Sequence, residues 1–167
     1  MKEAGLSLRK RIRLRNKDLD MTVRFGTWNV CTLLKAGNMN IVAEEAERYQ
    51  MVLVAFQAIR WKGKGSIGKS KFSLYYSGND DRQGIRGVVF IVSKKVSRSV
   101  LGFSHICDRI CTVRTKGKFH SVTFHNVYAP TEDTEDEIIN EFCDTLQVVS
   151  DEIPKHDAII TLGDFNA

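Results

Sequence analysis

The chain has 167 residues, and its 25 Lys and Arg against 20 Asp and Glu give a net charge of +5. Its length supports one domain with a sizeable core, and its 43 % hydrophobic content excludes a disordered, collagen-like or low-complexity chain. No apolar run approaches the ~20 residues that span a bilayer, and the early basic residues exclude a secretory signal, so we expect a nuclear or cytoplasmic protein that is not secreted.

The first 21 residues are predicted to form a basic, disordered arm. Residues 9–15 are mostly Lys and Arg, and they contain too few apolar side chains to form an element of the core. Such a run is compatible with a nuclear-localisation or nucleic-acid patch, but it is weakly specific. The folded domain is predicted to cover residues 22–167.

Strand and helix patterns alternate at the start of this domain. A strand begins at Val23, and Asn38 or Asn40 is placed to cap a helix over about 41–50. The continuous apolar run 51–56 is typical of a strand that is buried on both faces. These elements predict a β-α-β unit.

A basic, glycine-containing loop is predicted over residues 60–71. Within it, residues 63–70 match the letters of a phosphate-binding P-loop, G-x-x-x-x-G-K-[ST]. A P-loop requires a helix after it, whereas the aromatic run 72–76 predicts a strand. We therefore interpret the match as a basic surface loop. A polar turn over 78–87 and a buried strand over 88–92 follow.

The rest of the chain is predicted to add further strands and one helix. Thr134 and Glu137 have capping-box spacing, ahead of an apolar stripe at helical spacing that runs to Val149. The predicted strands cover residues 96–101, 109–114, 119–128 and 158–162, with a hairpin turn at 116–117. The whole order predicts a mixed α/β fold in which helices cross over between central strands.

Charge is segregated along the chain. Residues 60–95 contain nine basic and two acidic residues, whereas residues 131–157 contain ten acidic residues and one Lys. A domain with both segments is electrically polarised, and its basic face is suited to a polyanion such as nucleic acid. A solvated surface without a partner is the alternative. The candidate nucleic-acid-binding residues are Arg60, Lys62, Lys64, Lys69, Arg82 and Arg86.

The four cysteines do not have the spacing of a metal site. They include no C-x-x-C pair and have no His at zinc spacing. We expect reduced thiols that pack as small apolar groups. The four are Cys31, Cys107, Cys111 and Cys143.

Four polar motifs close predicted strands. They occupy residues 26–29, 56–61, 126–130 and 163–166. Asn and Asp are poor strand formers and costly to bury, so four such closures together indicate polar groups gathered around one site. In the third motif, the two-residue period of a strand places Asn126 and Tyr128 on the same face.

These motifs also carry a resemblance to a known family. In chain order they read T-W-N-V, R-W, R-G-V, N-V-Y-A-P and G-D-F-N-A. Residues 22–167 resemble the N-terminal part of the endonuclease/exonuclease/phosphatase superfamily, which has the DNase I-like fold. Within it they are most similar to the craniofacial development protein 2-like branch, which is related to LINE-type retrotransposon endonucleases. The resemblance implies a four-layer α/β sandwich, truncated so that the first sheet and its helices are present and the second sheet is incomplete.

The resemblance further implies a metal-dependent phosphodiesterase that uses Mg²⁺ and acts on DNA or RNA. Because binding would rest on the basic arm and on residues 60–95, we expect it to be independent of nucleotide sequence. The lack of a long apolar run predicts no membrane partner. By motif, Asn29 matches the asparagine near the metal and the scissile phosphate. Tyr128 matches the tyrosine that contacts the phosphate. Asp164 matches the aspartate that activates or orients the attacking water, and Asn166 matches the asparagine beside it.

Two departures from the family pattern weaken the expected activity. The family has a glutamate, its main Mg²⁺ ligand, directly after the position of Gln57, and this chain has Ala58 there. The C-terminal half of the family domain, with its closing Asp-His pair, is not expected here, and none of the four histidines lies in its motif. We therefore expect an inactive or strongly impaired endonuclease domain. The alternative is a non-catalytic remnant that binds nucleic acid or a protein.

Overall fold

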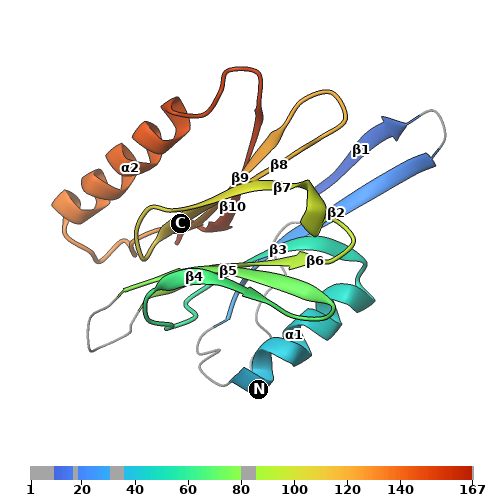
Figure 1. Ribbon diagram of the computed structural model, residues 1–167. Coiled ribbons are helices and arrows are strands. Elements are labelled where there is room, and N and C mark those ends of the chain that lie inside the picture. Colours follow the sequence, from blue (N-terminus) through green and yellow to red (C-terminus); the bar gives the residue numbers. More distant parts are fainter. Residues whose placement is uncertain (1–9, 17–18, 31–35, 80–85, 167) are drawn as a thin grey trace.

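Two β-sheets packed face to face form the centre of the molecule, with an α-helix outside each of them (Figure 1). The computed structural model describes residues 10–16, 19–30, 36–79 and 86–166, and over 10–16, 19–22 and 36–38 it describes the backbone. The arrangement of helix, sheet, sheet and helix confirms the predicted four-layer α/β sandwich.

The first sheet has the strand order β1-β2-β3-β6-β5-β4 in the described part of the chain. Its strands are β1 (Lys10–Asn16), β2 (Leu19–Asn29), β3 (Met51–Gln57), β4 (Lys64–Gly68), β5 (Phe72–Gly78) and β6 (Gly87–Ser93). β2 and β3 run parallel, whereas the other neighbours are antiparallel. A parallel pair needs a crossover connection, and helix α1 (Ala36–Arg48) lies within it.

The second sheet has the strand order β10-β9-β8-β7. Its strands are β7 (Val100–His105), β8 (Ile110–Thr115), β9 (Val122–Tyr128) and β10 (Ala158–Asp164). Only β9 and β10 run parallel, and helix α2 (Asp136–Asp151) lies in their crossover. Each sheet thus contains one parallel pair, and the carboxyl ends of both pairs carry polar motifs.

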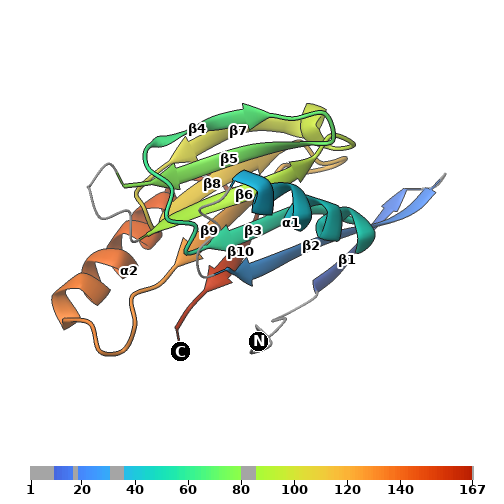
Figure 2. The same cartoon turned by 90° about the horizontal axis from the view of Figure 1, so that it is seen from below.

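The apolar core lies between the sheets and beneath α1. Phe25 from β2 and Phe124 from β9 meet edge to face with ring centroids 5.2 Å apart. Helix α1 covers the outer face of the first sheet with Met39, Ala43 and Ala46 (Figure 2). β3 and β6 are apolar on both faces because each is covered by α1 on one side and by the second sheet on the other. Each fully buried large apolar side chain contributes about 1.5–3 kcal/mol to folding.

Three predicted elements differ from the structure. The helix predicted over about 41–50 begins at Ala36, so Asn38 and Asn40 lie within it and neither is its N-cap. The expected loop over 60–71 contains β4, because residues 64–68 pair with β5. Residues 96–101, predicted as a strand, instead form a short 3₁₀ helix (η1, Ser97–Ser99) and then the start of β7. As predicted, a strand, β5, follows residues 63–70, whereas the surface loop expected there is largely strand β4.

The predicted capping box of α2 is wrong. The residue that precedes the helix is Glu135, and it makes no side-chain capping hydrogen bond. The hydroxyl of Thr134 lies 3.1 Å from that of Thr131 and hydrogen-bonds with it. The acidic residues Asp136 and Glu137 do occupy the first turn, where they complement the helix dipole.

The N-terminal boundary at residue 21 stays a prediction. Strand β1 and the first residues of β2 fall inside the predicted arm, and their backbones pair antiparallel. Residues 1–9 and 17–18 lie outside the described residues. No helix in the described part of the chain is long and apolar enough to cross a membrane.

Candidate functional site

Four strand ends bring predicted site residues to one edge of the sandwich. Asn29 ends β2 beside Gln57, the last residue of β3. Tyr128 ends β9 beside Asp164, the last residue of β10. Because β10 packs against β2 and β3, both parallel pairs deliver their carboxyl ends to the same place. The expectation that these polar closures lie together is therefore met.

Both carboxylate oxygens of Asp164 accept hydrogen bonds. The side-chain amide of Asn29 donates through Nδ2 to Oδ2, and the backbone N–H of Asn166 donates to Oδ1 over 3.0 Å. Asn166 in turn donates through Nδ2 to the carbonyl of Ala129 over 2.6 Å. Its φ of 48° is left-handed, a conformation that Asn tolerates better than most residues. The carboxylate is thus oriented from two sides.

A buried amide network behind the site joins the two sheets. Asn126 on β9 donates through Nδ2 to the carbonyls of Phe56, over 3.2 Å, and Val89, over 2.9 Å. Gln57 on β3 donates through Nε2 to Oδ1 of Asn126 over 2.7 Å. Both amide side chains are fully buried. Asn126 shares the face of Tyr128, as the strand period predicts, but it bridges the sheets and is closed to a ligand.

Tyr128 is held by Arg109, a residue that the sequence analysis did not single out. Arg109 lies directly before β8 and donates through Nη1 to the Tyr128 carbonyl over 3.0 Å. Its guanidinium carbon lies 5.5 Å from the centroid of the Tyr128 ring, in cation–π range. Partial burial and the neighbouring charge of Arg86 lower the pKa of Arg109, although a guanidinium stays charged. No motif marks this residue in the sequence, because its contact depends on the pairing of β8 with β9.

Ala58 follows β3 in an unusual backbone conformation. Its φ is 59° and its side chain is only 6 % exposed. A left-handed residue other than glycine costs roughly 1–2 kcal/mol, and such residues cluster at functional sites. The Ala58 methyl group supplies no atom that binds a metal or a phosphate.

The side chains at this edge do not fit a divalent cation. Mg²⁺ relies on protein carboxylates together with substrate phosphates. Asp164 is the only carboxylate of the predicted set, and each of its oxygens accepts one hydrogen bond, from Asn29 and from Asn166. No three His, Cys, Asp or Glu side chains in the described part of the chain are grouped closely enough to hold a metal. Asn29 was predicted to bind the metal beside a carboxylate at position 58, and Ala58 provides no carboxylate there.

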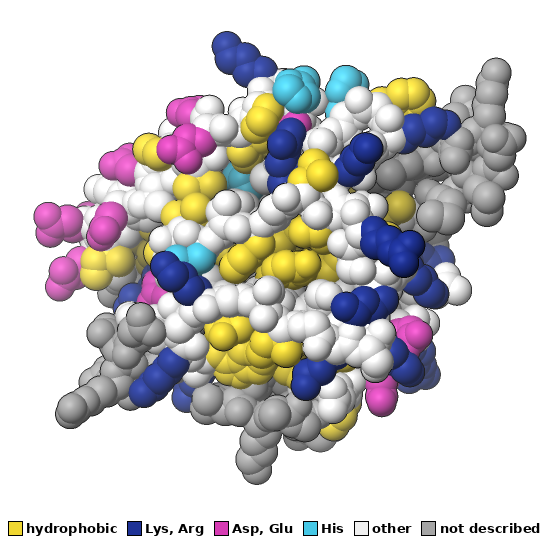
Figure 3. All heavy atoms as spheres, viewed as in Figure 1, with side chains coloured by type: hydrophobic (Ala, Val, Ile, Leu, Met, Phe, Trp, Pro, Cys, Tyr) yellow, Lys and Arg dark blue, Asp and Glu magenta, His cyan; other side chains and the backbone are white. Residues whose placement is uncertain are grey.

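The predicted nucleic-acid-binding residues divide between the two ends of the first sheet. Lys69 follows the end of β4 that lies away from the site, roughly 15 Å along the strand from Lys64. Arg82 lies outside the described residues. Figure 3 shows Lys and Arg side chains spread over one face of the molecule, with Asp and Glu gathered over α2. At the site edge lie Arg60, Lys62, Lys64 and Arg86.

The cysteines match the expectation only in part. Cys107, Cys111 and Cys143 are free thiols. Cys111 is fully buried in the core between the sheets, and burial raises its pKa well above the ordinary value. Cys143 is exposed on α2, so it does not pack as a small apolar group. Cys31 lies outside the described residues.

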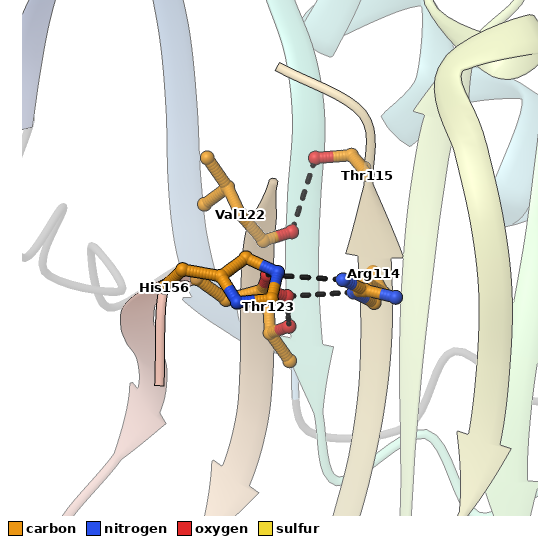
Figure 4. Close-up of polar contacts among 6 residues, drawn as sticks. Arg114, Thr115, Val122, Thr123 and His156 are labelled. Carbon is orange, nitrogen blue, oxygen red and sulfur yellow. Dashed lines mark hydrogen bonds and ion pairs between the residues drawn. The ribbon is translucent and has the colours of Figure 1, made fainter. Parts of the chain in front are cut away.

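A second polar cluster lies at the opposite end of the second sheet (Figure 4). Arg114 donates from Nε and Nη2 to the two carboxylate oxygens of Asp157, over 2.6 and 3.0 Å. The hydroxyl of Thr123 donates to the same carboxylate over 3.2 Å. Asp157 directly precedes β10, so this cluster fixes the start of the strand that ends in Asp164.

Comparison with known sequences identifies a partial relative. No established family model matches the chain. Craniofacial development protein 2 of Bos taurus is 33 % identical over 144 residues, which make up 85 % of this chain and 24 % of that protein. The chain thus spans about a quarter of the length of this curated relative.

Comparison with solved structures identifies the fold. The endonuclease domain of TRAS1, a telomere-specific non-LTR retrotransposon, superposes with a TM-score of 0.59 at 16 % identity, covering 87 % of this chain and 61 % of that chain. TDP2 of D. rerio, complexed with a single-strand DNA product, superposes with a TM-score of 0.64 at 12 % identity, with the same coverage. The chain has the endonuclease/exonuclease/phosphatase fold, of which it covers part, and the predicted resemblance is confirmed at that level.

Proposed function

We propose that this chain is a nuclease-type domain whose edge site binds the phosphodiester backbone of DNA or RNA without sequence preference, and that on its own it does not cut that backbone. The proposal rests on the convergence of Asn29, Tyr128, Asp164 and Asn166 at one edge of this fold. The complex of D. rerio TDP2 with a single-strand DNA product supports it by analogy of fold. A nuclear or cytoplasmic location belongs to the same proposal.

The side chains at the edge divide into one acceptor and several donors. Asp164 is a carboxylate held in place by Asn29 and Asn166, and it is suited to orient a water molecule or accept its proton. The phenol of Tyr128 is suited to donate to a phosphate oxygen. The basic residues at this edge, Lys64 among them, add long-range attraction for a polyanion.

Ala58 is the reason that we expect binding without cleavage. In phosphoryl transfer, stabilising the charge that develops on the phosphate is usually the largest contribution to the rate. A cation held by a carboxylate supplies several kcal/mol of that stabilisation, and its loss slows the reaction on the order of a thousandfold or more. The same residue favours the second candidate function, a remnant that binds nucleic acid or a protein and has no catalytic role.

A plasmid-nicking assay on the 167-residue chain in Mg²⁺ tests the catalytic half of the proposal. The unmodified protein and the Asp164→Ala variant should both leave supercoiled plasmid intact. Nicking by the unmodified protein that Asp164→Ala abolishes would overturn the expected inactivity.

Oligonucleotide binding at several salt concentrations tests the other half. Affinity for a labelled oligothymidylate should fall steeply as salt rises, because it rests on counterion release. The same affinity is expected for an oligonucleotide of another sequence. Undetectable binding at low salt, or tight binding that does not change with salt, would contradict an electrostatic nucleic-acid site.

A further inference from the structure

A groove lies between helix α1 and the first sheet, at the end of the sheet that is opposite the candidate site. Its volume is about 400 Å³, within the range of ligand-binding clefts. Helix α1 contributes the short side chains of Ala43 and Ala46, so it leaves space above the sheet. The floor of the groove is apolar and consists of Val54, Phe72 and Ile91. All three are buried, so only a group that enters the groove contacts them.

Lysine side chains line the sheet side of this groove. Lys71 forms an ion pair with Glu47 of α1 over 3.3 Å, and this pair joins the two walls. The side chains of Lys69 and Lys95 make no hydrogen bond or ion pair with any residue that the structure describes. Lys69 follows β4 and Lys95 follows β6, so two strand spacings, roughly 10 Å, separate them along the sheet. Acidic side chains three residues apart on an extended peptide have a similar spacing.

The helix side of the groove carries acidic and amide side chains. Glu44 and Glu47 line it there, whereas the described residues of the sheet side include no acidic one. A nucleic acid has a negative charge on every nucleotide, so these carboxylates would repel it. A peptide, in contrast, can direct its acidic side chains to the lysines alone. The amides of Asn40 and Gln50 also lie on the helix side and are suited to the N–H and C=O groups of a peptide backbone.

We propose that this groove binds an acidic peptide segment of a partner protein, with one large apolar side chain on the floor and carboxylates at Lys69 and Lys95. An apolar anchor in a pocket with a charged rim is a common arrangement in protein recognition. The proposal does not depend on nucleic-acid binding, which we place at the other end of the first sheet.

The test measures fluorescence anisotropy of labelled heptapeptides with the 167-residue chain at low salt. Each peptide of the set has a central Phe, Leu, Ile or Trp flanked by Asp and Glu, and at least one should bind with a dissociation constant below about 1 mM. Lys69→Gln and Lys95→Gln should each weaken that binding about threefold, the effect of one exposed ion pair. Glu44→Gln should strengthen it about twofold, because it removes a like charge. A peptide with Ser in place of the central apolar residue should bind about tenfold more weakly, because the floor is then not covered.

Lys64→Gln is the matched control, because Lys64 is an exposed lysine at the other end of β4. This variant should bind the peptide as the unmodified chain does. Equal losses for Lys64→Gln and Lys69→Gln would show only a general charge effect and would overturn the groove as the binding site. Unchanged affinity for the peptide with the central Ser would overturn it as well, since the apolar floor would then have no part in binding.

Failure of every peptide in the set to bind would reject the proposal. Two further probes cover the other occupants, namely vesicles of phosphatidylcholine with phosphatidylserine and an oligothymidylate. If no peptide binds, and binding of one of these probes falls in Lys69→Gln and Lys95→Gln but not in Lys64→Gln, the groove takes a lipid surface or a nucleic acid instead. The substituted residues are all exposed. If Lys69→Gln nevertheless does not fold by circular dichroism, Lys95→Gln decides, and unchanged peptide affinity in that variant overturns the inference.

Discussion

At the scale of single residues, the buried amide side chain of Asn126 joins the two sheets, which apolar side chains join elsewhere in this core. Asn126 reaches from the second sheet to two backbone carbonyls of the first and accepts a hydrogen bond from Gln57. Every one of these groups is removed from water, so each would cost free energy if left unpaired. The network lies directly beneath the strand ends that carry Asn29 and Asp164, and it therefore fixes how the two sheets present the site.

Asn126→Ala should destabilise the protein by about 2–4 kcal/mol, because it removes the buried hydrogen bonds to the Phe56 and Val89 carbonyls and leaves the Gln57 amide with the Thr27 hydroxyl alone as its partner. Urea unfolding of the variant and the unmodified chain measures the difference. Asn140→Ala, at an exposed position on α2, is the matched control and should change stability by less than about 0.5 kcal/mol. Equal effects of the two substitutions would show that the amide bridge contributes nothing specific.

At the scale of elements, β10 is fixed at both ends by polar contacts of different kinds. Arg114 binds the Asp157 carboxylate at its start, and the backbone of Ala129 binds the Asp164 carbonyl at its end. The hydrogen bond from Arg114 is the main reason that the pKa of Asp157 is lowered, with a further contribution from Thr123. Burial opposes this shift, since the Asp157 side chain is fully enclosed.

The Asp157 contact should make stability depend on acid pH. Because the pKa of Asp157 is lowered in the folded state, its contribution is fully present above the unfolded pKa of about 3.9 and is lost as pH falls through the lower folded pKa. Urea midpoints measured from neutral to acid pH should therefore fall more steeply for the unmodified chain than for Asp157→Asn. Asp144→Asn, at an exposed position on α2, should keep the pH dependence of the unmodified chain. Identical pH profiles for the unmodified chain and Asp157→Asn would show that the Asp157 contact does not cause the loss of stability in acid.

At the scale of the whole molecule, the second sheet has an open side. β10 is its last strand in the described part of the chain, so one row of its backbone groups faces no strand there. Ile159 on this strand is 45 % exposed, and Phe165, just beyond it, is 52 % exposed. An apolar strand edge of this kind is a site for association with another chain.

The isolated 167-residue chain should therefore associate as its concentration rises, which sedimentation velocity measures directly. Ile159→Lys places a charge at the strand edge and should shift the distribution toward monomer. Ile41→Lys changes an equally apolar side chain on α1 that is 60 % exposed, and it should leave association unchanged. A chain that is monomeric at every concentration would show that this edge is adequately protected by its own geometry.

Local pattern was enough to predict most strands, both helices and the four polar closures, because apolar periodicity and poor strand formers act over a few neighbouring residues. The prediction that Ala58 stands at the position of a family glutamate came from the resemblance and not from local pattern. The burial of Asn126, the left-handed backbone of Ala58 and the separation of Lys69 from the site edge depend on strand pairing and sheet stacking. Arg109 is the clearest case, because its contact with Tyr128 exists only once β8 has paired with β9. Such contacts join residues that lie far apart in the chain, and only the tertiary structure decides them.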